Sequence, residues 1–395
     1  MGDPSNLFSI DLKGGAFLVN ALYIHIPFCT HICHYCDFNK VFLKGQPVDE
    51  YLEALDKEMK LTTKRFPTGQ LKSIFIGGGT PTSLNHVQLE NLMKSIHTYF
   101  PVNSALEFTI EANPGDLTKE KLSVLKEYGV NRLSLGVQTF NNDLLKKIGR
   151  AHRSDDVYRT VEDAKTIGFS NISVDLMYGL PGQSIEDVED SLNKVFHLNV
   201  QHCSAYSLIV EPKTVFYNLM NKGKLHLPGE DAEANMYELI MMEMEKHGFR
   251  QYEISNYAKL GYESLHNIVY WDNEEYYGIG AGAHSYLNGV RRSNIGPVNK
   301  YIHSLKEEKL PIREEIPLTK KDQMEEEMFL GLRKTKGVSL SKFEAKFSES
   351  IFNVYRDNIE HLLSQQLIQI NSDYIQLTKK GRMLGNEVFQ QFLIS

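Results

Sequence analysis

Short apolar runs alternate with longer amphipathic stretches from residue 21 to about residue 210. Runs typical of strands occupy 21–27, 72–79, 106–114, 131–140, 171–181 and 202–210. Between them, apolar residues recur near the helical period over 48–66, 87–100, 117–129, 154–168 and 184–198. Strands that alternate with helices predict a parallel sheet with right-handed crossovers. We therefore predict an α/β fold, a partial (β/α)6 barrel whose functional groups gather at the carboxyl ends of its strands.

The pattern changes after the polar, proline-containing stretch 309–323, which we interpret as a domain boundary. Three helical patterns follow, and then a hairpin over 367–381 that turns at Asn371, Ser372 and Asp373. Three helices with a two-stranded wing predict a winged-helix-like domain. The expected division is a flexible N-terminal tail at 1–20, a core domain with its C-terminal extension at 21–310, and the winged-helix-like domain at 311–395.

Composition and charge narrow the class of protein. Hydrophobic residues make up 42% and charged residues 24%, which are ordinary values for a globular chain with a sizeable core. The net charge of -7 and the acidic run at 325–327 argue against nucleic-acid binding. No stretch approaches the roughly 20 apolar residues that span a bilayer, and residues 1–20 lack the pattern of a secretory leader. We expect a cytoplasmic protein, a monomer or dimer, without a transmembrane segment.

Three of the chain's four cysteines lie within eight residues, just after the first predicted strand: Cys29, Cys33 and Cys36. In the cytosol, clustered cysteines indicate metal binding or catalysis more often than disulfides. A [4Fe–4S] cluster normally takes four thiolates, so three would leave one iron open for an exchangeable ligand. The alternative is a zinc site completed by His31 or His34, although structural zinc usually draws on two separated ligand pairs. The lone Cys203 is typical of packing.

Polar and small residues follow several of the predicted strands. A carboxyl, an amide or a cation stands at or beyond the ends of the later strands, and a triple glycine follows the second: Gly77, Gly78, Gly79, Thr80, Glu111, Gln138, Arg150 and Asp175. Each signal is weak by itself, since a triple glycine is often only a turn and an aspartate is often a cap. Together they suit a ligand that has amino, carboxylate and ribose groups.

The cysteine motif HIPFCTHICHYC, followed by GGGTP, EANP, GVQTF and VDLMYGLPGQ, resembles the radical S-adenosylmethionine (SAM) superfamily. The branch it is similar to is that of oxygen-independent coproporphyrinogen III dehydrogenase, and the likeness runs from about residue 21 to the C-terminus. It implies a three-cysteine [4Fe–4S] cluster, SAM on the open iron, an electron donor and radical chemistry carried by the cofactor. It also implies SAM contacts at Tyr23, Tyr35, Gly78, Gly79, Thr80, Glu111, Gln138, Arg150 and Asp175.

One departure separates two branches of this family. The dehydrogenases have a further cysteine two residues after the third, where this chain has Phe38. The sequence instead resembles haem chaperones of the HemW type, whose motif continues CDF. The segment HNIVYW (266–271), which holds the only tryptophan, is similar to the HNxxYW segment linked to haem in that group. The resemblance implies haem contacts at His266, Tyr270 and Trp271, with His266 as the candidate iron ligand.

Two alternatives stay open in this region. A histidine beside aromatic residues is often a hydrogen-bonded core residue rather than a ligand. His284, which follows a glycine-rich stretch that we interpret as a loop, is a weaker candidate for the iron. At the level of function, we expect a haem chaperone that passes haem to an unknown acceptor protein, and the alternative is a coproporphyrinogen III dehydrogenase. The sequence assigns no catalytic residue.

Overall fold

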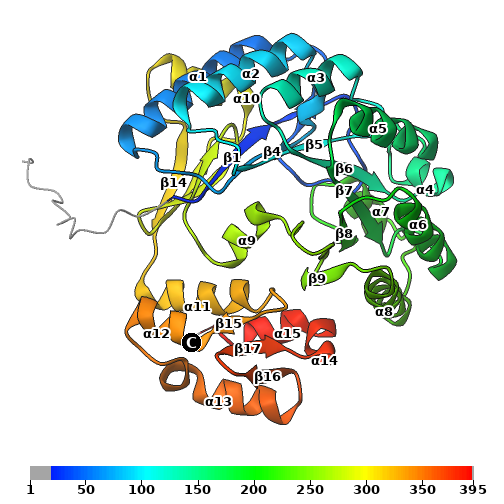
Figure 1. The fold of residues 1–395 in the computed structure, drawn as a ribbon, viewed down its shortest axis with the longest axis vertical. Coiled ribbons are helices and arrows are strands. Elements are labelled where there is room, and N and C mark those ends of the chain that lie inside the picture. Colours follow the sequence, from blue (N-terminus) through cyan, green and yellow to red (C-terminus); the bar gives the residue numbers. More distant parts are fainter. Residues whose placement is uncertain (1–18, 394–395) are drawn as a thin grey trace, which may run out of the picture.

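The computed structural model describes residues 19–393, so most of the tail expected over 1–20 lies outside the described residues. One curved sheet of 12 strands organises the larger part of the chain. Its middle consists of parallel strands β1 (Ala21–Ile26), β4 (Ser73–Gly78), β5 (Glu107–Ala112), β6 (Arg132–Gln138), β7 (Asn171–Tyr178) and β8 (His202–Ser207). These six strands confirm the predicted α/β fold and its partial barrel. The sheet forms an arc that stays open on one side (Figure 1).

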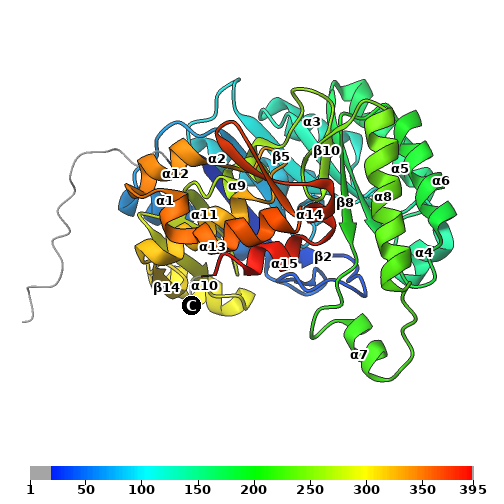
Figure 2. The same ribbon diagram turned by 90° about the horizontal axis from the view of Figure 1, so that it is seen from below.

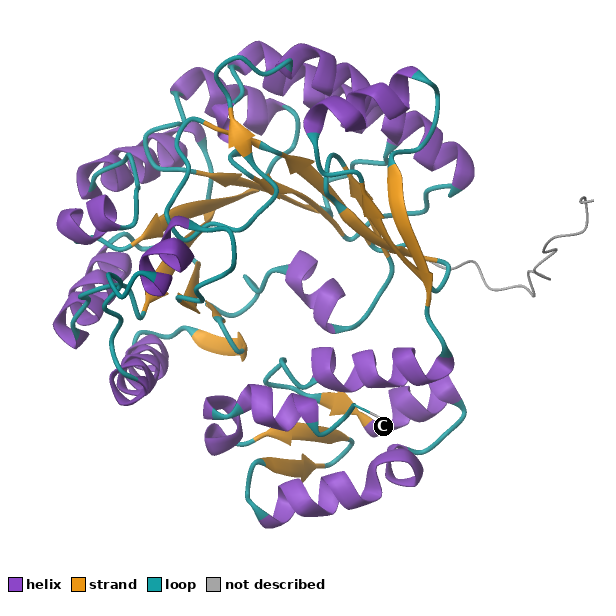
Figure 3. Ribbon diagram, turned by 180° about the vertical axis from the view of Figure 1, so that it is seen from behind, coloured by secondary structure: helices purple, strands orange, loops and turns teal. Residues whose placement is uncertain are grey.

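Helices cover the convex face of this arc (Figures 1 and 3). Those predicted from the periodicity are α1 (Val48–Arg65), α2 (His86–Tyr99), α3 (Lys119–Glu127), α5 (Ser154–Ile167) and α6 (Ile185–His197). The structure adds α4 (Asn142–Lys147), α7 (Val215–Asn221), α8 (Glu230–Lys246) and α10 (Val298–Lys306). Fully buried side chains such as Leu55, Met93 and Leu192 belong to one continuous core with the strands. Helix-on-sheet burial of this kind is the principal stabilising contribution in α/β domains.

Both edges of the sheet extend beyond the predicted strands. On one side β11 (Tyr276–Ile279) runs parallel to β1, and β12 (His284–Leu287), β13 (Val290–Asn294) and β14 (Ile312–Pro317) follow antiparallel. On the other side lie β10 (Asn256–Ala258) and β9 (Arg250–Glu253). The glycine-rich stretch expected to be a loop is therefore two strands and a turn. A Cβ on Gly278 would lie 1.7 Å from the carbonyl oxygen of His284, so this pairing requires a glycine.

A smaller domain with its own apolar core follows (Figure 1). It contains α11 (Lys320–Gly331), β15 (Val338–Ser339), α12 (Leu340–Phe347), α13 (Ile351–Ser364), β16 (Ile368–Asn371), β17 (Tyr374–Leu377), α14 (Lys379–Met383) and α15 (Gly385–Gln390). The predicted three helices and hairpin are present, and the hairpin turn has Ser372 at φ 53°. Strand β15 pairs with β17, so the wing has three strands.

The stretch 309–323, interpreted as a domain boundary, contains strand β14, which pairs with β13 in the large sheet. Sequence alone suggested a linker because the side chains of this edge strand are mostly exposed and charged. Arg292 of β13 anchors it through a 2.6 Å contact between its Nε and an oxygen of Glu315. We therefore propose that the division between the domains lies after β14, at Leu318 and Thr319, rather than at residue 310.

Helix α9 (Leu265–Trp271) lies on the concave side of the arc, and the smaller domain lies in front of it in Figure 2. The buried Glu107 carboxylate accepts hydrogen bonds from the backbone N–H groups of Leu265 and His266, both at 3.1 Å. An acidic group at a helix N-terminus is favoured by the unpaired N–H groups there. Strand β5 thus holds the start of α9 against the inside of the sheet. No helix in the described part of the chain is long and apolar enough to cross a membrane.

Candidate functional site

A cavity of about 400 Å³ lies on the concave side of the sheet, at the carboxyl ends of its parallel strands. The candidate cluster and SAM residues all line it: Cys29, Cys33, Cys36, Tyr23, Tyr35, Gly78, Gly79, Thr80, Glu111, Gln138, Arg150 and Asp175. His266 and Tyr270 reach the same cavity from α9, whereas Trp271 does not. Residues from distant parts of the chain meet here because parallel strands end at one edge of a sheet.

The loop that carries Cys29, Cys33 and Cys36, called the cysteine loop, begins where β1 ends. Cys29 lies in the short strand β2 (Phe28–Cys29), which pairs with β3 (Val41–Phe42). Cys29 is 5% exposed, and the hydroxyl of Thr80 lies 3.5 Å from its sulfur. Burial raises the pKa of the Cys29 thiol to about 11. A metal that binds there must displace this proton, since only the thiolate is a ligand. A Cβ on Gly79 would lie 3.0 Å from the Cys29 sulfur, so the glycine permits the close approach.

The two histidines of the cysteine loop are not arranged as zinc ligands. Nδ1 of His34 donates to the carbonyl oxygen of Lys147 at 2.8 Å, and its ring packs edge-on against Phe216. His31 is exposed. Within residues 19–393, no three or more His, Cys, Asp or Glu side chains are placed to hold a single metal ion. The alternative of a zinc site completed by His31 or His34 therefore gains no support from the structure.

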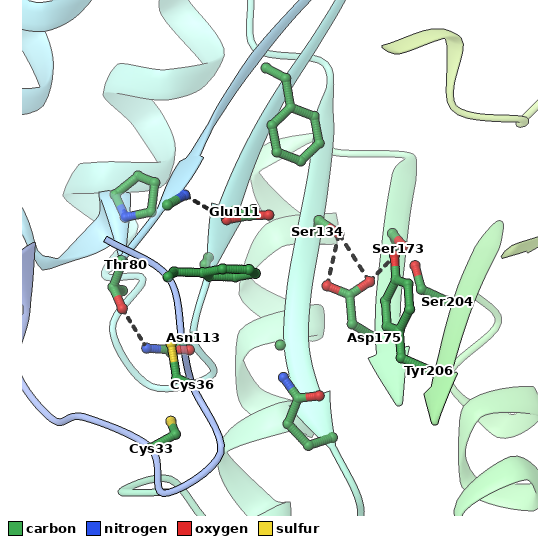
Figure 4. A pocket seen from close by; sticks show the side chains of 18 of the residues that line it. Cys33, Cys36, Thr80, Glu111, Asn113, Ser134, Ser173, Asp175, Ser204 and Tyr206 are labelled. Atoms are coloured by element: carbon green, nitrogen blue, oxygen red, sulfur yellow. Dashed lines mark hydrogen bonds between the residues drawn. The ribbon is translucent and has the colours of Figure 1, made fainter. Parts of the chain in front are cut away.

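A buried cation stands beside the cysteines. Nη1 of Arg150 donates to Oδ1 of Asn113 at 2.9 Å and lies 3.5 Å from the sulfur of Cys33. Nη2 donates to the carbonyl oxygen of Gly136, while the buried Nε has no partner. A guanidinium with an unused donor is suited to a carboxylate that approaches in its plane. The amide of Asn113 also donates to the hydroxyl of Thr80, which connects the cation to the cysteine loop (Figure 4).

Carboxylates occupy the other side of the cavity (Figure 4). The backbone N–H of Gly78 donates to Oε2 of Glu111 at 3.1 Å. Burial, together with the charge of Asp175, raises the pKa of Glu111 to about 8. Asp175 accepts from the hydroxyl of Ser134 at 3.0 and 3.1 Å and from that of Ser173 at 3.4 Å, and burial raises its pKa also. Neutral at pH 7, Glu111 would gain a charge when a cationic ligand enters.

Gln138 ends strand β6 with an unusual backbone. Its φ is 67°, and the pairing with β7 shifts register between Gly136 and Gln138. An irregularity of this kind redirects a side chain at the end of a strand. Tyr23, from β1, places its hydroxyl 3.0 Å from Nδ1 of His25, and Tyr35 packs against a small apolar cluster under the cysteine loop. These residues give the cavity amide, phenol and apolar surface.

His266 is packed and hydrogen-bonded at both ring nitrogens. Nδ1 lies 3.0 Å from the hydroxyl of Ser73, and Nε2 lies 2.9 Å from that of Tyr270. The ring stacks on Phe75 at 5.0 Å, the side chain is 1% exposed, and burial lowers its pKa to about 3. Both ring nitrogens are engaged in hydrogen bonds to hydroxyl groups, and iron ligation by His266 stays a prediction. The packing matches the alternative of a core histidine that the sequence left open.

Trp271 lies apart from His266, with the guanidinium of Arg333 5.2 Å from its ring. Arg333 follows α11 and also lies 5.1 Å from the ring of Phe389 in α15, so Trp271 belongs to the contact between the two domains. His284 begins β12 and does not line the cavity. Of the three residues that the resemblance associates with haem, His266 and Tyr270 therefore line the cavity, whereas Trp271 lies at the contact between the domains.

Several residues of the cavity were not singled out from the sequence: Asn113, Arg132, Ser134, Ser173, His202, Ser204 and Tyr206. The sequence did contain a signal for these residues, because side chains at every second position of a strand point to the same face of the sheet. Along β6, positions 132, 134, 136 and 138 all face the cavity, and β7 and β8 repeat this pattern. Polar residues at every second position of a strand buried by helices on its other face indicate a polar interior.

Comparisons with known proteins agree with this geometry. The family model described as the radical SAM superfamily matches residues 23–195, and that of the HemN C-terminal domain matches residues 318–384. The heme chaperone HemW of Bacillus subtilis is 55% identical over 376 residues, covering 95% of this chain and 99% of that protein. This chain belongs to the HemW family of the radical SAM superfamily.

More distant members and a solved structure extend the comparison. The HemW protein of Escherichia coli is 33% identical over 378 residues, covering 94% of this chain and 98% of that protein. The coproporphyrinogen III oxidase HemN of Escherichia coli, described as a radical SAM enzyme, superimposes with a TM-score of 0.83 at 25% identity. That match covers 95% of this chain and 90% of HemN. This chain thus shares the fold of both its domains with HemN.

Proposed function

We propose that this HemW-family chain is a haem chaperone that binds haem and transfers it to an acceptor protein. The observation that carries the proposal is the 55% identity, over 95% of the chain, to a protein named a heme chaperone. The match covers 95% of this chain and 99% of that protein, so it spans both domains. The expected protein partners are a haem acceptor and an electron donor.

We also propose that the cavity holds a [4Fe–4S] cluster with SAM on its open iron. The thiolates would come from Cys29, Cys33 and Cys36. Arg150 would donate hydrogen bonds to the SAM carboxylate. Glu111 and Asp175 offer acceptors for the amino and ribose groups across the cavity. When bound, these cofactors supply one-electron cleavage of the sulfonium carbon–sulfur bond. The protein's part is to orient SAM and to keep the site enclosed.

The second candidate function is oxidative decarboxylation of coproporphyrinogen III, which the TM-score of 0.83 to HemN favours. The difference between the branches lies at residue 38. Phe38 lines the mouth of the cavity and is 60% exposed, where the resemblance places a cysteine in the dehydrogenases. A phenyl ring offers no thiol for redox chemistry or for iron. We therefore prefer the chaperone.

An activity assay separates the two functions. The reconstituted, reduced protein is incubated anaerobically with SAM and coproporphyrinogen III, and porphyrinogens are quantified after oxidation. We expect no protoporphyrinogen, whereas added haemin gives a saturable change in its Soret band. The cluster absorbance is recorded in the same sample, so that an empty site is not mistaken for an inactive one. Formation of protoporphyrinogen over many turnovers would overturn the preference for the chaperone.

The raised pKa of Glu111 predicts a pH dependence of SAM binding. A cationic ligand favours the carboxylate, so below pH 8 binding requires the loss of a proton. SAM affinity should rise by up to about tenfold per pH unit toward pH 8 and then level off, because linkage allows one proton per site. Equilibrium dialysis at pH 6.5, 7.5 and 8.5 measures this. Glu111→Gln should flatten the profile, and an equally steep profile in that variant would exclude Glu111 as its source.

A further inference from the structure

A second and larger cavity lies between the two domains. This cleft has a volume of about 1110 Å³. Its walls come from α9 and the sheet edge near β12 on one side and from α11, α12, β15 and β17 on the other. Figure 2 shows the smaller domain crossing in front of α9. Small-molecule sites commonly occupy about 300–1,000 Å³ and often lie between domains, so the cleft is large enough for a ligand of considerable size.

The cavity at the cysteines is too small to hold haem beside SAM. Its volume of about 400 Å³ is near the lower end of the range for small-molecule sites. SAM on a cluster would already fill it, and a tetrapyrrole is larger than SAM. In addition, both nitrogens of His266, the candidate iron ligand at its wall, are engaged in hydrogen bonds. Haem therefore needs a different place in the molecule.

The cleft is lined by four lysines and four carboxylates, and the lysines without a carboxylate partner suit an anionic, planar ligand. Among the described residues, neither Lys336 nor Lys342 has a carboxylate within ion-pair distance, while Lys334 and Lys346 in the same wall are paired with Asp272 and Glu327. Nζ of Lys336 lies 4.8 Å from the ring of Tyr374, and ammonium groups without a carboxylate partner suit the carboxylates of a ligand. Apolar and aromatic surface comes from Ile268, Val338, Tyr286 and Tyr374.

An unsatisfied donor in the wall points to a ligand independently. Asn273 is 4% exposed, and its Nδ2 has no hydrogen-bond partner, although its Oδ1 accepts from Arg291 at 2.7 Å. A buried donor without a partner costs about 1–3 kcal/mol, which an acceptor on a ligand would remove. The neighbouring Glu275 has a buried Oε2 that also lacks a partner. Residues of this wall thus keep one donor and one acceptor without a partner among the described residues.

We propose that the cleft between the two domains is the haem site of this protein, with the propionates directed at Lys336 and Lys342. The proposal rests on the proposed chaperone function and specifies where its cargo binds. No His, Cys or Met among the described residues lines the cleft. The haem iron is thus left without a histidine, cysteine or methionine ligand, the ligands of most stable haem proteins. Such a site releases its haem readily to an acceptor that supplies an axial ligand.

Helix α9 is the wall that the two cavities share. His266 and Tyr270 face the cysteine cavity, whereas Ile268 and Asp272, at the helix C-cap, face the cleft. Its N-terminus is fixed to β5 through Glu107. The segment linked to haem by resemblance therefore borders the proposed haem site without contributing its histidine. This placement reconciles the family motif with the occupied nitrogens of His266.

The test uses the full-length protein with its cluster reconstituted and two probes, haemin and haemin dimethyl ester, which lacks the propionate charges. Affinities are measured by titration of the Soret band. We expect the wild type to bind haemin about tenfold more tightly than the ester. Lys336→Glu/Lys342→Glu should lose about tenfold in haemin affinity while binding the ester as before. Lys60→Glu/Lys64→Glu, on the exposed face of α1, changes the net charge equally and should behave like the wild type.

Each result decides a different question. Wild-type haemin affinity in Lys336→Glu/Lys342→Glu would overturn the cleft as the haem site and leave the chaperone function standing. Absence of any saturable haemin binding by the wild type would overturn both. His266→Gln provides the third arm, because the cleft site predicts an unchanged Soret position. A shifted Soret band in His266→Gln, with its cluster intact, would place the iron at the cysteine cavity instead.

Discussion

Replacing Cys29, Cys33 or Cys36 with alanine should abolish the [4Fe–4S] absorbance of the protein after anaerobic reconstitution. Each thiolate would hold one iron of the cubane, and no other cysteine of the described residues lines this cavity to replace a lost one. The visible spectrum and the iron and sulfide content measure this outcome. SAM binding should be lost in the same variants, because the open iron that chelates SAM disappears with the cluster.

Cys203→Ala is the matched control for these variants. Cys203 is fully buried in β8, where it packs in the main core. The substitution removes one thiol from the chain yet should leave the cluster spectrum unchanged. A complete cluster in Cys33→Ala would refute the three-cysteine assignment. Because one iron of the proposed cluster would lack a thiolate, we also expect the cluster absorbance of the wild type to bleach in air.

Replacing Arg150 with alanine should weaken SAM binding by about 10–100-fold, the equivalent of roughly 1.5–3 kcal/mol for hydrogen bonds to a charged group. The guanidinium is buried beside Cys33 and keeps one donor without a partner. A SAM carboxylate on the neighbouring iron would lie within its reach. Equilibrium dialysis on the reconstituted variant gives the affinity, and its cluster absorbance should match that of the wild type.

Arg159→Ala controls for the loss of a positive charge near this region. Arg159 is exposed on α5 and pairs with Asp156 at the surface. Its loss should leave SAM affinity unchanged. If Arg150→Ala also binds SAM as the wild type does, the carboxylate is held by another group. Loss of the cluster in Arg150→Ala would instead give the arginine a structural role at Cys33.

The alternation of strands and helices was predictable because local periodicity reports which side of an element is buried. The six parallel strands and the five helices on their outer face were expected from this pattern, and the structure contains them. Strand β14 was missed because this kind of prediction depends on a pattern of buried residues. As an edge strand it is mostly exposed, so its sequence carries no burial pattern, and only its pairing with β13 identifies it.

The composition of the cysteine cavity was largely predictable, because residues at the ends of parallel strands meet wherever a sheet of this kind forms. The interior positions Ser134, Ser173 and Ser204 were missed, although their period of two was readable in the strands. The interdomain cleft could not be predicted. Its walls come from two domains whose contact depends on tertiary packing, and no local pattern marks Lys336 or Lys342 as free of carboxylates.

By itself, the sequence determined the order of strands and helices, the loop that carries three cysteines and the family to which the chain belongs. The tertiary structure decided what the segment 266–271 does. Because an α-helix turns about 100° per residue, His266 and Tyr270 share one face while the adjacent Trp271 points elsewhere. Helix α9 packs between the two domains, so one of its faces lies at the cysteine cavity and the other faces the smaller domain. Residues that are adjacent in the motif are therefore separated in the structure.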